Sequence, residues 1–162
     1  MEVTLIFQGH IPSKKNSKRI ANGRILPSKA YESWHKAELA TLQDAFAIPS
    51  PVEIEYSFRI GGKDRPREFD LSNAEESIND LLVDAGIIED DSWLHLISKK
   101  STIEGFYRGS GRCEVTIRHV PGVAWRNSIL ALKNESAINR IKELTGRSKT
   151  AIRDGLWTEI TL

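Results

Sequence analysis

The chain has 162 residues, of which 40% are hydrophobic and 28% charged, and its formal net charge is +1. These values are typical of one ordinary globular domain with room for a small appendage, and so small a net charge says little about partners. The single cysteine, Cys113, excludes an internal disulfide and a cysteine-based zinc site. No apolar run approaches the ~20 residues that cross a membrane, so we expect a cytoplasmic protein without a membrane partner.

The N-terminal segment combines short strands with a basic loop. Alternation of side-chain character over residues 3–7 predicts a first strand. A polar, basic loop follows at residues 11–19. The pair Asn22-Gly23 favours a type I′ turn, which predicts two short paired strands near residues 19–21 and 24–26.

A helix and a longer strand come next. Ser28 is placed to cap a helix that runs to about Phe46, with apolar residues at helical spacing. Residues 52–58 alternate between apolar and polar side chains, which predicts a half-buried strand. We expect Gly61-Gly62 to end this strand.

A second helix is predicted from about Leu71 to Ala85, and Gly86 is placed to cap its C-terminus. Its apolar residues share one face, which we expect to be buried: Ile78, Leu81, Leu82 and Ala85. Its polar residues fall in a narrow arc on the opposite face: Asn73, Glu76, Asp80 and Asp84.

Two more strands complete this part of the chain. One is predicted near residues 93–98 and the last at residues 113–119, with a glycine-rich connection around residues 105–111 between them. The pair Pro121-Gly122 then indicates a boundary.

The boundary predicts a domain over residues 1–120 and a helical extension over residues 121–162. From Val123 onward the extension is basic, with seven cations, four acids and a net charge of +3. The cations are Arg126, Lys133, Arg140, Lys142, Arg147, Lys149 and Arg153. The acids are Glu135, Glu143, Asp154 and Glu159. Its pattern predicts a helix, a turn and a second helix that Ser148 caps.

Two interpretations of this extension stay open. In a DNA-binding helix-turn-helix, the second helix would enter a major groove, and Lys149 and Arg153 would face phosphates or bases. Alternatively, the two helices form a hairpin that packs on the core or on a dimer partner.

Acidic side chains gather at both ends of the second predicted helix, namely Asp70, Glu76, Asp80, Asp90 and Asp91. Carboxylates gathered in this way repel one another, and they are tolerated when water solvates them or when a hard cation such as Mg²⁺ neutralises them. The acids therefore indicate either a solvated helix face with an acidic turn, or a metal site that acts on phosphates.

The basic loop is ambiguous when taken alone. Its ammonium and amide donors suit phosphate oxygens, and the loop is equally compatible with an exposed turn; these donors are Lys14, Lys15, Asn16 and Lys18. Basic loop and acid cluster together are more informative, because a nuclease needs cations to hold the DNA backbone and acids to hold the metal.

Several motifs occur in a characteristic order. They are Pro12-Ser13-Lys14-Lys15-Asn16-Ser17, Asp70-Leu71-Ser72-Asn73, Asp80-Leu81-Leu82, Ala85-Gly86-Ile87-Ile88 and Asp90-Asp91. Over about residues 1–120, this order resembles the RusA-type Holliday-junction resolvases. Phage-borne relatives look similar here, with Ser or Thr before the Asn and Glu three residues after it.

The resemblance implies an α/β (α+β) fold, in which two main helices pack on a small mixed sheet and the C-terminal helical extension is additional. It also implies a homodimer that cuts branched DNA with Mg²⁺ held by aspartates. Asp70 matches the first metal-site aspartate, and Asp90 and Asp91 match the downstream acidic pair, with Asp91 the stronger candidate.

The chain departs from the family pattern at two positions. Ser72 stands where the family has a second aspartate, and a hydroxyl is a weak, neutral ligand. Glu76 aligns with a lysine of the better-known members, so the missing carboxylate is expected to come from Glu76 or Asp80.

Our leading hypothesis is a Mg²⁺-dependent endodeoxyribonuclease, with Mn²⁺ as a substitute, that resolves Holliday junctions or other branched DNA in recombination and repair. We expect the catalytic residues to be Asp70, Glu76, Asp90 and Asp91, with Asp80 as a further metal ligand. We expect DNA contacts from Lys14, Lys15, Asn16, Lys18, Arg67, Asn73, Lys149 and Arg153. The rival hypothesis is a non-catalytic DNA-binding or regulatory protein with a decayed nuclease site and a C-terminal helix-turn-helix.

Overall fold

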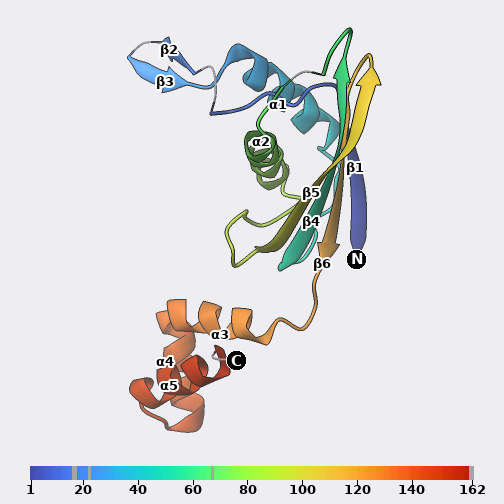
Figure 1. Ribbon diagram of the computed structural model, residues 1–162. Coiled ribbons are helices and arrows are strands. Elements are labelled where there is room, and N and C mark those ends of the chain that lie inside the picture. The colour runs from blue at the N-terminus through green and yellow to red at the C-terminus, as the bar shows by residue number, and fades with distance from the viewer. Residues whose placement is uncertain (16–17, 22, 67, 161–162) are drawn as a thin grey trace. The chain divides into compact units, whose positions relative to one another are not determined.

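The computed structural model describes residues 1–15, 18–21, 23–66 and 68–160. The chain divides into two compact units, Met1–Val120 and Pro121–Leu162, and this division falls at the Pro121-Gly122 pair. Figure 1 shows the elements of both units. Among the described residues, no helix has the length and apolar character needed to cross a membrane.

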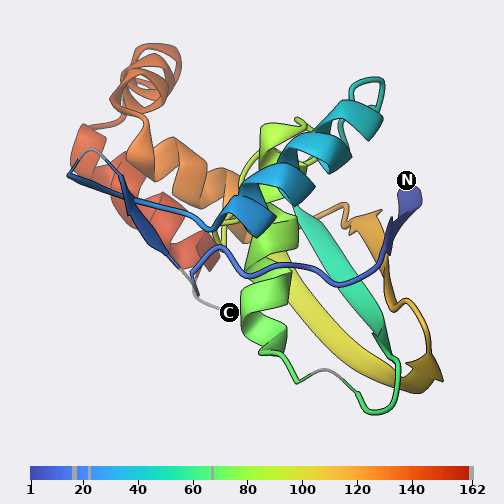
Figure 2. The same ribbon diagram turned by 90° about the horizontal axis from the view of Figure 1, so that it is seen from above.

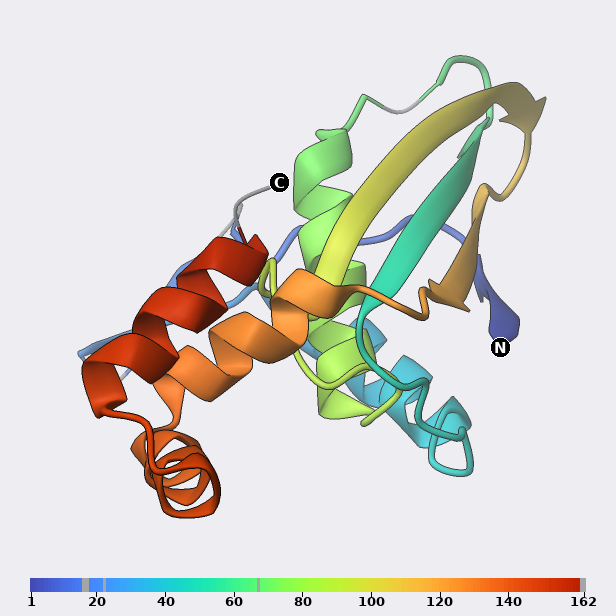
Figure 3. The same ribbon diagram turned by 90° about the horizontal axis from the view of Figure 1, so that it is seen from below.

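The first unit is built on one mixed sheet whose strands lie in the order β1 (Glu2–Gln8), β6 (Arg112–His119), β4 (Val52–Gly62) and β5 (Leu96–Arg108). β6 pairs antiparallel with both β1 and β4, whereas β4 and β5 run parallel and lie side by side (Figure 3). A parallel pair needs a crossover connection, and α2 (Leu71–Asp84) provides it. The mixed α and β fold class predicted from the sequence is therefore confirmed.

Both helices of this unit, α1 (Lys29–Thr41) and α2, cover the same face of the sheet (Figures 1 and 2). Burial alternates along β4 as predicted: the inward residues are Val52, Ile54, Tyr56 and Phe58, and the outward ones are Glu53, Glu55, Ser57 and Arg59. The apolar face of α2 packs on this layer through Ile78, Leu81 and Leu82. Cys113 of β6 lies in the same core, and burial raises the pKa of its thiol to about 12.

A short hairpin, β2 (Arg19–Ala21) and β3 (Arg24–Leu26), projects away from the sheet (Figures 1 and 2).

Ser28 caps α1 as predicted, because its hydroxyl accepts a hydrogen bond from the Tyr31 N–H at 3.1 Å. The predicted end of α1 was wrong: the helix stops at Thr41, and Phe46 is 57% exposed. The chain turns here because Ile48 enters the core and its N–H donates to the Ile87 carbonyl at 2.8 Å.

Two predictions about glycines were also wrong. β4 continues through Gly61 and Gly62, because its parallel pairing with β5 extends to Gly62 and Arg108. At Gly61 a Cβ atom would lie 2.1 Å from the Gly111 nitrogen, so the glycine allows a close approach of two backbones. β5 likewise continues through Gly105 to Arg108, which leaves only a short connection before β6.

The second unit contains α3 (Ala124–Lys133), α4 (Glu135–Thr145) and α5 (Lys149–Ile160), and α3 lies beside α5 (Figure 3). α4 and α5 are the two helices predicted from the sequence, whereas α3 was not predicted. Gly146 ends α4 with a left-handed φ of 69°, and the Ser148 hydroxyl accepts a hydrogen bond from the Ala151 N–H at 3.2 Å. Ile138 and Ile152 form the buried centre of this unit.

Candidate functional site

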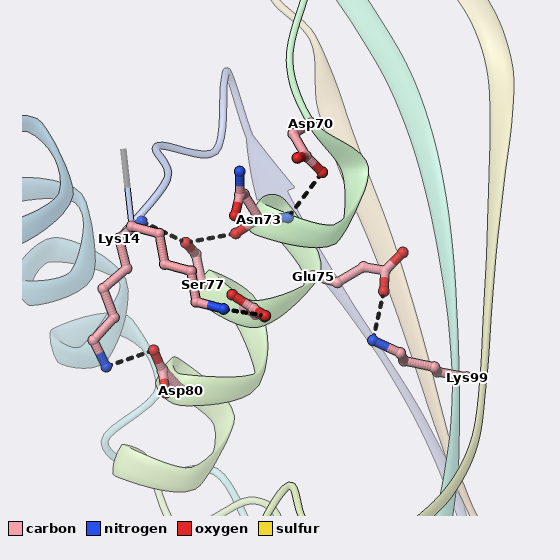
Figure 4. A network of polar contacts seen from close by, with 9 residues as sticks. Lys14, Asp70, Asn73, Glu75, Ser77, Asp80 and Lys99 are labelled. Atoms are coloured by element: carbon pink, nitrogen blue, oxygen red, sulfur yellow. Dashed lines mark hydrogen bonds and ion pairs between the residues drawn. The ribbon is translucent and has the colours of Figure 1, made fainter. Parts of the chain in front are cut away.

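The N-terminal half of α2 holds the basic loop in place. Asp70 caps the helix, with its Oδ1 accepting from the Asn73 N–H at 3.4 Å. One turn later, the Ser77 hydroxyl donates to the Asn73 carbonyl at 2.9 Å and accepts from the Lys14 N–H at 3.1 Å. The backbone of the loop is thereby attached to the polar face of α2 (Figure 4).

Two lysines of the loop lie over two acids of the helix. Lys14 Nζ is 2.6 Å from Asp80 Oδ2, and Lys15 Nζ is 2.7 Å from Glu76 Oε1. All four side chains are partly exposed, so each pair contributes at most about 1 kcal/mol to stability. The lysines can therefore exchange these carboxylates for another anion at small cost.

These groups line a pocket of about 580 Å³ to which four chain segments contribute. The loop supplies Lys14, Lys15 and Lys18; β3 and the residue after it supply Ile25, Leu26 and Pro27; and the acids are Glu76, Asp80 and Asp91. Asp91 reaches the pocket from the connection between α2 and β5. Three cations and three carboxylates thus share one hollow at the polar face of α2.

Two predicted acids lie elsewhere. Asp70 lines a separate hollow with His10 and Phe69, because ten residues of helix place it about 15 Å along the axis from Asp80. Asp90 Oδ1 accepts from the Ser92 N–H at 2.7 Å, and this hydrogen bond lowers the pKa of the Asp90 carboxyl. The structure therefore brings together only three of the five predicted metal ligands.

A hard cation needs several oxygen ligands around it. Across the described parts of the chain, no group of three or more His, Cys, Asp or Glu side chains is placed to hold a metal ion. Mg²⁺, however, is usually held by one or two protein carboxylates together with water and substrate phosphates. Glu76, Asp80 and Asp91 offer oxygens of the kind that such an ion binds, and one or two of them are enough for this mode of binding.

The predicted DNA contacts have different outcomes. Asn16 and Arg67 lie outside the described residues. Asn73 lies on the polar face of α2, beside the backbone of the basic loop (Figure 4). In the second unit, Lys149 and Arg153 both bind the Glu135 carboxylate, at 2.5 Å and 2.6 Å.

The other side of α2 carries a polar cluster that was not predicted. Glu75 is only 8% exposed, and its carboxylate lies 3.0 Å from Lys99 Nζ (Figure 4). The same carboxylate accepts a hydrogen bond from the Ser101 hydroxyl at 2.5 Å. Nearby, the buried Tyr56 hydroxyl donates to Asn79 Oδ1, and burial raises the pKa of Tyr56 well above its usual value. Glu75 could have been found in the sequence, because it stands three residues before Ile78 on the buried face.

A comparison of the chain with protein-family models found no match, and a comparison with curated proteins found none either.

Proposed function

We propose that this protein is a Mg²⁺-dependent endodeoxyribonuclease for branched DNA. The observation that carries the proposal is the pocket in which three lysines and three carboxylates from separate segments meet. Phosphodiester cleavage requires both kinds of group, because cations hold the phosphates and carboxylates hold the metal. The motif order that resembles the RusA-type resolvases supports the same reaction.

Each side chain of the pocket has a role in this scheme. Lys14, Lys15 and Lys18 bind phosphate oxygens, and Lys14 and Lys15 leave their carboxylate partners when a phosphate enters. Glu76, Asp80 and Asp91 are the oxygen ligands available to the cation. When bound, Mg²⁺ supplies charge neutralisation at the phosphate and activation of water. We assign metal binding to one or two of these acids, Asp91 among them, and Asp70 and Asp90 stay predictions from the resemblance.

A homodimer is part of the proposal. A four-way junction presents two symmetry-related positions for cleavage, and a twofold-symmetric enzyme matches them. The resemblance implies the same assembly. The substrate is therefore a branched duplex that two copies of the pocket engage together.

Cleavage of synthetic four-way junctions tests the proposal. We expect wild-type protein to cut the junction with Mg²⁺, and Asp91→Asn to lower the rate by more than about tenfold, because removing even an outer-shell partner of a metal site typically costs 10–100-fold. Asp44→Asn is the matched control, because Asp44 is an exposed carboxylate outside the pocket. Full cleavage by Asp91→Asn would remove Asp91 from the mechanism.

One observation favours the rival function, a non-catalytic DNA-binding or regulatory protein. Lys14 and Lys15 neutralise Asp80 and Glu76, and Ser72 adds no charge where the related family has an aspartate. This rival predicts junction binding that survives EDTA and no cleavage with Mg²⁺ or Mn²⁺. Metal-dependent cutting by wild-type protein would eliminate it.

A further inference from the structure

The projecting hairpin presents two large apolar side chains to solvent. Ile20 and Ile25 are directly paired across β2 and β3, so both side chains lie on the same face of the hairpin. They are 81% and 71% exposed. Exposed isoleucines gain nothing from the hydrophobic effect, so an adjacent pair at the end of a projection is suited to a partner that buries it.

The base of this hairpin is attached to α1. Arg19 Nη2 contacts both carboxylate oxygens of Glu32, at 2.9 Å and 2.7 Å. Glu32 lies in the first turn of α1, immediately after the Ser28 cap. The ion pair anchors one end of the hairpin and leaves the isoleucine pair projecting.

The hairpin is continuous with the candidate site. Ile25 itself lines the pocket that contains Lys14, Lys15 and Lys18. Lys18, just before β2, and Arg24, the first residue of β3, lie at the two ends of the hairpin and are both exposed. An apolar pair flanked by cations complements a nucleic acid, because the flat faces of the bases are apolar and the phosphates are anionic.

We propose that the β2–β3 hairpin is a wedge that enters the branch point of the DNA, with Ile20 and Ile25 placed against unstacked bases. The inference rests on the proposed function, because the same DNA must place a phosphate in the pocket beside Ile25. Isoleucine is among the side chains that DNA-bending proteins insert between base steps. Base pairs at a branch point lack a continuous stack, so separating them there costs less than within a duplex.

The experiment uses a four-way junction with 2-aminopurine at the branch point, with EDTA present so that no cleavage occurs. The fluorescence of this base rises when it leaves its stack. We expect wild-type protein to raise the fluorescence, and the double variant Ile20→Ser/Ile25→Ser to lose most of that rise. Ile6→Ser/Ile103→Ser is the matched control, because these isoleucines are half-exposed on sheet strands and lie outside the pocket and the hairpin.

Circular dichroism of each variant shows that the fold is retained, as expected for substitution of exposed side chains. A wild-type rise that the hairpin variant retains in full would overturn the wedge. So would a wild-type protein that cuts the junction in the separate assay with Mg²⁺ but gives no rise in EDTA. A fluorescence rise without metal-dependent cleavage would instead overturn the nuclease and keep the wedge. If wild-type protein binds no junction, both proposals fail. A second copy of the chain is the other possible partner of the isoleucines. If the hairpin variant no longer self-associates but still raises the junction fluorescence as wild-type protein does, the isoleucines bind that second copy and the wedge is overturned.

Discussion

The carboxylate side chains on the two sides of α2 differ in their burial and in their partners. Glu76 and Asp80 are partly exposed and pair with partly exposed lysines, so these partners can be exchanged for a ligand at small cost. Glu75 is buried between the helix and β5, where its oxygens bind Lys99 (Figure 4) and the Ser101 hydroxyl. A buried charge without a partner is costly, so this cluster is expected to support the position of α2.

Substitution of Lys99 by Met tests this support. We expect Lys99→Met to lower the free energy of unfolding by about 1–3 kcal/mol, because the Glu75 charge loses its cation. This loss is smaller than for a fully buried pair, because Lys99 is half-exposed. Lys100→Met is the control, because Lys100 is the next residue of β5, with the opposite orientation, and is exposed. Urea denaturation of both variants measures the difference, and equal stabilities would show that Glu75 does not need Lys99.

At the scale of elements, α4 and α5 are joined by an ionic clamp. The clamp consists of Glu135 in the first turn of α4 with Lys149 and Arg153 of α5. The two cations lower the pKa of Glu135, so the clamp is present above the usual pKa of a carboxyl group and is lost as the pH falls through the lowered value. Lys149 and Arg153, the two cations of this unit that were predicted to contact DNA, therefore pair with a carboxylate of their own unit.

Release of this clamp should strengthen binding to DNA if the predicted contact is real. Glu135→Gln removes the charge that competes with phosphates for Lys149 and Arg153. We expect higher affinity for duplex DNA and a salt dependence steeper by up to about two counterions. Glu143→Gln is the control, because Glu143 lies on the same helix and its carboxylate pairs with Arg140 of that helix, at 3.5 Å. Fluorescence anisotropy over a salt series measures both quantities, and identical slopes for the two variants would contradict the contact.

For the molecule as a whole, the two compact units divide the charge unevenly. The buried core of the first unit consists of residues between Phe7 and Ile117, so it does not depend on the helices of the second. The second unit has a net charge of +3, although the chain has only +1. If the protein binds DNA as proposed, the positive charge available for phosphates is thus concentrated in the part of the chain that lies outside the predicted catalytic pocket.

Deletion of residues 121–162 tests this contribution. We expect weaker binding to four-way junctions and a smaller salt dependence, because fewer phosphates are neutralised. Cleavage of fully bound junction should persist, because the lysines and acids of the pocket all belong to the first unit. Anisotropy and single-turnover cleavage separate the two effects. Unchanged affinity and slope would show that the extension does not contact phosphates.

The predictions that agreed with the structure depend on local patterns. The alternation along β4 and the caps at Ser28 and Gly86 were correct, because neighbouring residues decide them. The errors at Phe46 and Gly61 arose where distant segments determine the conformation. Ile48 is drawn into the core against Ile87, and Gly61 packs against the backbone of Gly111.

The sequence by itself determined most of the order of strands and helices, although not α3, together with the polar face of α2 and the presence of acids and lysines suited to phosphate chemistry. Only the tertiary structure decided which of these groups meet. Lys14 lies 66 residues before Asp80, yet their side chains are in contact, whereas Asp70 caps the same helix and lines another hollow. The physical reason is that periodicity reports which face a side chain occupies, while the folding back of the loop and of the Asp91 turn onto α2 depends on long-range packing.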